Sequence, residues 1–125
     1  MKILLVFSDE GLGKGFVDGI VRIENSEVVL IENGALALDY LSKNNFDLAV
    51  TAKTLSDMTG IEFIEKLVTI NPMINTAVAS DLSKKDFHEA TEGLGVLMSI
   101  PLEAGAKDAD GLLDYLYKIN MMMSV

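Results

Sequence analysis

The sequence predicts an α/β fold, a doubly wound parallel sheet of five strands in the order 2-1-3-4-5 with helices on both faces, which makes a three-layer sandwich. Five short apolar runs recur along the 125 residues, and each is continuous, as expected for a strand that is covered on both faces. Segments with helical spacing of apolar side chains separate the runs. The connections are short, which favours parallel strands joined by right-handed crossovers.

The apolar runs and the helical segments alternate along the chain. We expect strands at residues 3–7, 28–31, 48–50, 74–79 and 96–100. The helices are expected around apolar residues spaced by three or four positions, namely Leu12, Phe16 and Ile20, then Ala35, Leu38 and Leu41, then Ile64, Leu67 and Val68, then Phe87, Ala90 and Leu94, and last Leu112, Leu116 and Ile119. The predicted order is therefore a strand followed by a helix, repeated five times.

Local signals mark where two helices begin and where one ends. Thr59 followed by Glu62 fits a capping box, and Ser83 followed by Asp86 approximates one with a shorter acid. The glycines at positions 93 and 95 can end the fourth helix.

Other segments have less local support. Gly13, Gly15 and Gly19 each cost the first helix about 1 kcal/mol relative to alanine, so we expect that helix to be short or partly irregular. The longest stretch without secondary structure is expected at residues 103–111. Residues 1–121 are expected to form a single domain, with a loose tail at residues 122–125.

Composition narrows the class of partner. The chain carries 10 Lys and Arg against 19 Asp and Glu, a formal charge of −9, which opposes binding to nucleic-acid phosphates and to anionic membranes. It has no cysteine, which excludes disulfides and thiolate metal sites. The apolar start MKILLVF is broken at once by polar residues and is too short for a signal peptide or a membrane span. We therefore expect a soluble, cytoplasmic protein that binds neither nucleic acid nor membrane.

The stretch FDLAVTAKTLSDMTG at residues 46–60 leads a strand into the carboxyl edge of the sheet, where ligands bind in open α/β folds. The switch point between the first and third strands lies at the same edge. The residues expected there are Ser8, Asp9, Glu10, Ala52, Lys53, Thr54, Ser80, Asp81 and Ile100. The sequence therefore predicts a place shaped like a binding site but poor in reactive groups.

Several motifs are shared with a known family along essentially the whole chain. They are KILLV at the start, IENGALALDYL after the second strand, FDLAV leading into LSDMTGIEFIEKL, NP before the fourth strand and IP after the fifth. In these motifs and their spacing the chain resembles the response-regulator receiver domain, the phosphoacceptor module of bacterial two-component signalling. The resemblance implies a flavodoxin-like fold.

The resemblance also implies that the family's acidic residues are missing here. Receivers carry two adjacent acids after the first strand, and the matching positions are Phe7 and Ser8, with Asp9 at the next position. The aspartate that accepts the phosphoryl group corresponds to Ala52. An acyl phosphate needs a carboxylate nucleophile and Mg²⁺ needs oxygen ligands. We therefore expect no phosphorylation at Ala52, weak or absent Mg²⁺ binding and no other cofactor.

Three further positions of the family's pocket have counterparts. By the resemblance, Ser80 matches the hydroxyl residue that binds the phosphoryl group, Ile100 before Pro101 matches the lysine that pairs with it, and Leu97 matches the aromatic switch residue. Clustered carboxylates repel one another unless a cation offsets them, so loss of the acids removes the need for the lysine. The substitutions fit together as a rebuilt apolar pocket.

Some polar residues of this edge have more than one interpretation. Asp9 and Glu10 could bind a metal, or they could end the first strand near a helix N-terminus, where negative charge is favourable. Ser80 could bind a phosphoryl group, or it could satisfy the local backbone at a strand end.

The leading hypothesis is a non-enzymatic signalling module, a degenerate receiver that acts by phosphorylation-independent protein–protein interaction. Its partner would be a protein of a signalling pathway or a second copy of the chain. Receivers use the face formed by the fourth helix, the fifth strand and the fifth helix for partners and dimers. By resemblance, the candidate interaction face here carries Lys84, His88, Leu97, Asp114 and Lys118.

Two other functions stay open. A small-molecule or nucleotide sensor would need a pocket at the carboxyl edge, around Ser8, Thr54 and Ser80. A receiver phosphorylated at an atypical acid would use Asp9 or Asp57. Asp57 also fits a simpler role as a turn and capping residue before the third helix.

Overall fold

The computed structural model describes residues 1–8 and 11–123. Its centre is a parallel sheet of five strands in the order β2-β1-β3-β4-β5, so the predicted fold class and strand order are confirmed. The strands are β1 (Lys2–Val6), β2 (Glu27–Ile31), β3 (Leu48–Thr51), β4 (Asn75–Ala79) and β5 (Met98–Ile100). In the register, Leu5 of β1 lies between Leu30 of β2 and Val50 of β3.

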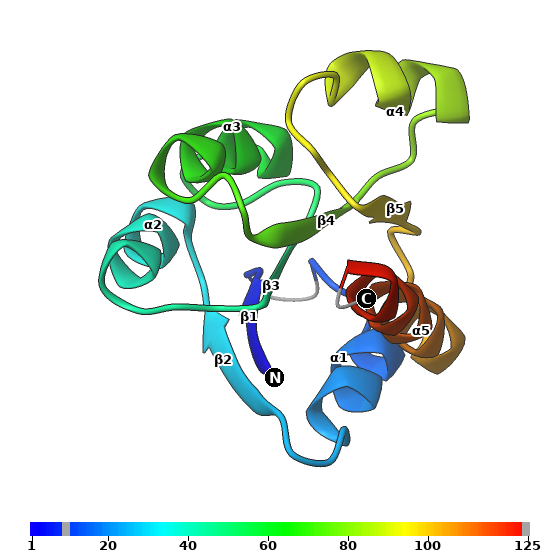
Figure 1. The fold of residues 1–125 in the computed structure, drawn as a ribbon. Coiled ribbons are helices and arrows are strands. Elements are labelled where there is room, and N and C mark those ends of the chain that lie inside the picture. The colour runs from blue at the N-terminus through cyan, green and yellow to red at the C-terminus, as the bar shows by residue number, and fades with distance from the viewer. Residues whose placement is uncertain (9–10, 124–125) are drawn as a thin grey trace.

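The described residues also form five helices, which alternate with the strands. They are α1 (Lys14–Val21), α2 (Gly34–Lys43), α3 (Gly60–Ile70), α4 (Lys84–Ala90) and α5 (Ala106–Met123). Figure 1 shows α2 and α3 on one side of the sheet, with α4 on that same side near the β5 end, and α1 and α5 on the other side. None of these helices combines the length and the apolar character needed to cross a bilayer.

The core is built on the central strands. Residues 3–6 of β1 and 48–51 of β3 are all buried, as the continuous apolar runs predict. β2 differs because it is an edge strand: Leu30 is 54% exposed, and no residue of β2 is fully buried. The apolar run of β2 is therefore not covered on both faces.

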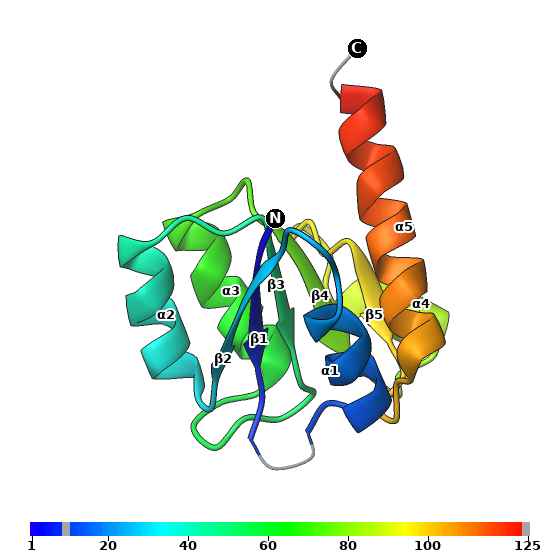
Figure 2. The same ribbon diagram turned by 90° about the horizontal axis from the view of Figure 1, so that it is seen from below.

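The glycines of the first helical segment have a packing role. A Cβ atom on Gly13 would lie 1.9 Å from the carbonyl oxygen of Ala104, and one on Gly19 would lie 2.9 Å from the Cβ of Ala109. α1 therefore packs closely on the β5–α5 connection and on α5, beside which it lies in both views (Figures 1 and 2). The glycines lower the helix propensity of this segment, but they let α1 approach the β5–α5 connection and α5 more closely than larger residues would. As predicted, α1 is short, with 8 residues.

α5 is longer than predicted at both ends. It begins at Ala106, inside the stretch 103–111 that was expected to be irregular. The start is stabilised by Asp108, whose carboxylate accepts a hydrogen bond from the Gly105 N–H (2.8 Å), the acidic half of a capping box. The helix continues to Met123, so the first part of the expected loose tail is helical, while residues 124–125 lie outside the described residues.

The connection from α4 to β5 also differs from the prediction. α4 ends at Ala90, and the turns that follow place Gly93 and Gly95 at φ values of 81° and 68°, which favour glycine. β5 begins at Met98, so Leu97 precedes the strand on which it was expected.

The predicted helix starts are present. The Thr59 hydroxyl accepts from the Glu62 N–H (3.1 Å), and the Glu62 carboxylate accepts from the Thr59 N–H (3.3 Å), which makes a complete capping box. The Ser83 hydroxyl accepts from the Asp86 N–H (3.1 Å) at the start of α4.

Candidate functional site

Ala52 directly follows β3, in the centre of the edge where a site was predicted. Its side chain is fully buried, and its N–H donates to the carbonyl oxygen of Val6 at the end of β1 (2.9 Å). Two glycines approach it closely. A Cβ on Gly11 would lie 3.0 Å from the Ala52 Cβ, and one on Gly60 would lie 2.2 Å from the Ala52 carbonyl oxygen. The methyl group is enclosed, and solvent does not reach it.

The connection after β1 brings Phe7 and Ser8 to the same place. The Gly11 N–H donates to the Ser8 carbonyl oxygen (3.0 Å). A Cβ on Gly11 would lie 3.1 Å from that oxygen and 3.6 Å from the Phe7 Cβ, as well as against Ala52. The structure therefore gathers these three predicted residues around one glycine.

Ser80 begins the connection from β4 to α4. Its N–H donates to the Ile100 carbonyl oxygen at the end of β5 (2.9 Å), and its hydroxyl oxygen accepts from the Leu82 N–H (3.0 Å). The side chain thus satisfies the local backbone, as one of its two interpretations predicted. Ile100 itself is only 2% exposed.

An ion pair joins two connections at this edge. The Lys53 ammonium, after β3, lies 2.9 Å from a carboxylate oxygen of Asp81, after β4, and both side chains are about half exposed. The hydrogen bond from Lys53 lowers the pKa of the Asp81 carboxyl below its ordinary value. The sequence placed both residues at the edge without pairing them. A hint of the pairing in the sequence is that two residues of opposite charge follow neighbouring strands.

Asp57 caps a helix, but α2 rather than α3. Its two carboxylate oxygens accept from the N–H groups of Gly34 and Ala35, each at 2.9 Å. These bonds, first from Ala35 and then from Gly34, lower the pKa of the Asp57 carboxyl below its ordinary value. The turn before α3 is thereby tied to the start of α2, a tertiary contact that no local pattern indicates.

The described residues do not supply a metal site. Among them, no three His, Cys, Asp or Glu side chains gather closely enough to hold a metal ion. Asp9 and Glu10, the two candidates from the sequence, lie outside the described residues, so the predictions for them are untested.

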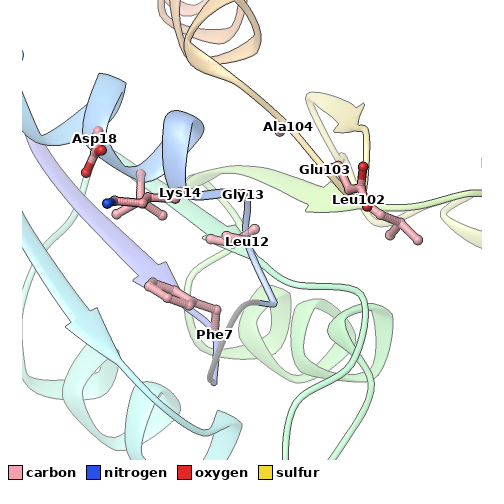
Figure 3. Close-up of a pocket in the computed structure, with 9 residues that line it drawn as sticks. Phe7, Leu12, Gly13, Lys14, Asp18, Leu102, Glu103 and Ala104 are labelled. Atoms are coloured by element: carbon pink, nitrogen blue, oxygen red, sulfur yellow. The ribbon is translucent and has the colours of Figure 1, made fainter.

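A hollow of about 610 Å³ opens beside the edge, between the start of α1 and the β5–α5 connection (Figure 3). Apolar side chains of Phe7 and Leu102 and charged side chains of Lys14 and Glu103 contribute to its lining. The lining does not include the residues around which a ligand pocket was predicted, which are Ser8, Thr54 and Ser80.

A groove of about 680 Å³ lies between α4 and β5. Lys84, Lys85 and His88 of α4 line it together with Phe87, and residues 96–99 line the opposite side. Three residues of the predicted interaction face, namely Lys84, His88 and Leu97, are therefore brought together here.

The other two residues of that predicted face are on α5 and outside the groove lining. The Lys118 ammonium lies 3.0 Å from a carboxylate oxygen of Asp114, one helical turn away, and both side chains are more than 60% exposed. An exposed pair at this spacing stabilises a helix only slightly.

The sheet order, the helices on both faces and the edge at the ends of β1 and β3 define a fold of the CheY-like receiver type. A CheY-like response regulator receiver domain protein from Methanospirillum hungatei has a TM-score of 0.79 and 19% identity over 97% of both chains. The non-phosphorylated HemR receiver domain from Leptospira biflexa has a TM-score of 0.76 and 23% identity over 92% of both chains.

The chemotaxis response regulator CheY4 of Vibrio cholerae is similar as well, with a TM-score of 0.78 and 15% identity over 92% of this chain and 97% of its own. No protein-family model and no curated protein sequence matches the chain. At these identities the likeness establishes the fold.

Proposed function

We propose that the chain is a non-enzymatic signal-transduction module, a degenerate receiver that acts by phosphorylation-independent protein–protein interaction. The observation that carries the proposal is the buried methyl group of Ala52 at the end of β3, where receivers by resemblance carry the phosphoacceptor aspartate. A methyl group cannot attack phosphorus, because it has no electron pair to donate.

Two carboxylates near this edge already have partners. Asp57 binds the start of α2 and Asp81 binds Lys53. Phosphorylation of either carboxylate would first have to break those bonds. A carboxylate without such partners is a better phosphoacceptor. The arrangement supports a module whose resting state does not depend on phosphate.

The α4–β5 groove is the surface proposed to receive the partner. Its lining includes the half-buried apolar side chains of Phe87, Leu97 and Met98 and the charged side chains of Lys84 and Lys85. Apolar pockets rimmed by charge are typical of protein interaction sites.

The first test asks whether the pocket around Ala52 responds to Mg²⁺ and to a mimic of the phosphoryl group. Amide NMR spectra of the purified chain would be recorded alone, with millimolar Mg²⁺, and with beryllofluoride as a mimic of aspartyl phosphate. We expect unchanged peaks. Saturable shifts that spread from residues 7–8 to Ser80 and Leu97 would contradict the proposal.

The same experiment has a covalent arm. Intact mass after exposure to acetyl phosphate is expected to show no phosphoryl group. An added phosphoryl group that disappears in Asp9→Asn or Asp57→Asn would favour the receiver with an atypical acid instead.

The second test concerns the surface. Wild-type chain, Leu97→Ala with Lys84→Glu, and a Lys43→Glu control on α2 would each be used to capture proteins from a lysate. We expect a partner that binds wild type and the control, is lost with the groove variant, and is unaffected by acetyl phosphate. Binding that requires acetyl phosphate would contradict the proposal.

One observation favours a second candidate, a small-molecule or nucleotide sensor. The hollow of about 610 Å³ beside α1 is large enough for a small ligand, and its lining carries one basic side chain, Lys14, and two acidic ones, Asp18 and Glu103. Thermal melting with a panel of nucleotides and carboxylates tests this function, because a ligand that binds only the folded chain raises Tm.

A further inference from the structure

The connection from β4 to α4 is held at the carboxyl edge by polar contacts to its neighbours. The Ser80 N–H donates to the Ile100 carbonyl oxygen of β5 (2.9 Å). On the other side, Asp81 pairs with Lys53 (2.9 Å), which belongs to the connection after β3. The ion pair is thus the tie that joins the start of this connection to the centre of the sheet edge.

α4 has little packing to hold it in place. None of its 7 residues is buried, and Phe87 is the one that packs partly against the core. Figure 1 shows α4 standing apart from the other helices. Because helices in proteins owe most of their stability to a packed apolar face, the position of α4 depends on the connections at its two ends.

The far end of α4 has its own anchor. Thr91, which follows the helix, is buried and so holds this end against the protein, while its hydroxyl donates within the helix to the Phe87 carbonyl oxygen (2.8 Å). The turns after it contain Gly93 and Gly95 at positive φ, and they permit the chain to bend. The near end, where Asp81 lies, is therefore the place at which a small change would move the helix.

We propose that the Lys53–Asp81 ion pair is a conformational lock, which holds the β4–α4 connection to the sheet edge and so fixes α4 and the width of the α4–β5 groove. The inference rests on the proposed function, since it names the regulation of the same interaction surface. The resemblance implies that a phosphoryl group controls the conformation of a working receiver. The proposal gives that control to a fixed pair of side chains.

The exposure of the pair makes the lock adjustable. Both side chains are about half exposed, and an exposed ion pair contributes little to the stability of a whole domain. The lock therefore acts on α4 and not on the core. A partner that binds the released form better than the locked one shifts the population by the ratio of its two affinities.

The test uses Lys53→Met and Asp81→Asn, each compared with wild type by thermal melting, amide NMR and hydrogen exchange. We expect an almost unchanged Tm. We also expect amide shifts through Leu82, Asp86 and His88 to Leu97, and exchange in α4 that is faster by about twofold to fivefold, as loss of an exposed ion pair allows. The exchanged pair, Lys53→Asp with Asp81→Lys, is expected to bring the shifts and the exchange back toward wild type.

A matched control separates the lock from a general effect of charge. Lys118→Met and Asp114→Asn break an ion pair of similar length, 3.0 Å, and greater exposure on α5. They are expected to leave α4 exchange unchanged. Shifts confined to the neighbours of positions 53 and 81, with wild-type exchange in α4, would overturn the lock.

The outcome is independent of the tests of the proposed function. All measurements use the purified chain without a phosphodonor or a partner, so a response to beryllofluoride would refute the degenerate receiver and leave the lock standing. Failure of α4 to respond to loss of the pair would refute the lock and leave the interaction surface untouched.

Discussion

Replacing Asp57 with asparagine tests whether a single carboxylate ties the β3–α3 connection to α2. In the native chain, Asp57 accepts from the Gly34 and Ala35 N–H groups, and Asn33 accepts from the Leu36 N–H (2.8 Å). The N–H groups of the first three residues of α2 thus each have a side-chain acceptor. A carboxamide has one oxygen for two N–H groups and no charge to complement the helix N-terminus.

The expected loss follows from this geometry. Loss of an N-cap contact costs about 1 kcal/mol, and the exposure of Asp57 lets water replace part of what is removed. For a chain of 125 residues, a change of about 1 kcal/mol in the free energy of unfolding lowers Tm by about 4 °C. Urea unfolding of Asp57→Asn and wild type at pH 7 measures the difference.

The effect has a defined pH dependence. The pKa of Asp57 is lowered from its ordinary value of 3.8, so the folded state favours the charged form. Its contribution is present above the pKa of the unfolded chain and is lost as the pH falls through the lowered pKa of the folded state. The difference between wild type and Asp57→Asn should therefore be constant near pH 7 and shrink below about pH 4.

A matched variant makes the result interpretable. Asp39→Asn removes the same charge from the middle of α2 and breaks an exposed ion pair with Lys43 (3.3 Å), so we expect a change within about 0.5 kcal/mol. Equal effects of the two variants, or an Asp57→Asn effect that persists undiminished at acid pH, would refute the capping role.

Three further predictions concern packing and capping, each measured by urea unfolding. Gly13→Ala should destabilise the fold by about 3 kcal/mol or prevent folding, because the added Cβ would meet the Ala104 carbonyl oxygen. The control, Gly111→Ala, places its Cβ in open space within α5 and should stabilise the fold by about 0.5–1 kcal/mol. Ala52→Asp should destabilise more at pH 7 than at pH 5, since the buried position disfavours a charged carboxylate; equal loss at both pH values would contradict this. Thr59→Ala should cost about 1 kcal/mol through loss of the capping box, and an unchanged midpoint would show that the cap is not needed.

Most of the fold follows from patterns that operate over a few residues. The runs of β1 and β3 are continuous because both faces of these central strands are covered. The start of α5 was missed because AKDAD has no apolar period, and its cap depends on Asp108 binding back to Gly105. The glycines at the start of and within α1 made its helix harder to predict. The reason for these glycines is tertiary, because they lie against Ala104 and Ala109.

The candidate site divides in the same way. The place of Ala52 at the carboxyl edge can be predicted, because it follows an apolar strand, but its complete burial is seen only in the structure. The Asp57 contact with α2 and the Lys53–Asp81 pair could not be predicted, since each depends on how connections from different strands meet at one edge. The sequence placed these residues at the edge, but it did not predict which groups they would bind.

These two contacts have a common consequence. Carboxylates that lie close together repel one another and favour whatever cation or proton reduces the repulsion. Here Asp57 is neutralised in effect by a helix N-terminus and Asp81 by Lys53. Both lowered pKa values indicate that the surrounding protein favours the charged forms. Each of these two charges is therefore stabilised by a fixed group of the chain, a helix N-terminus for Asp57 and the Lys53 ammonium for Asp81.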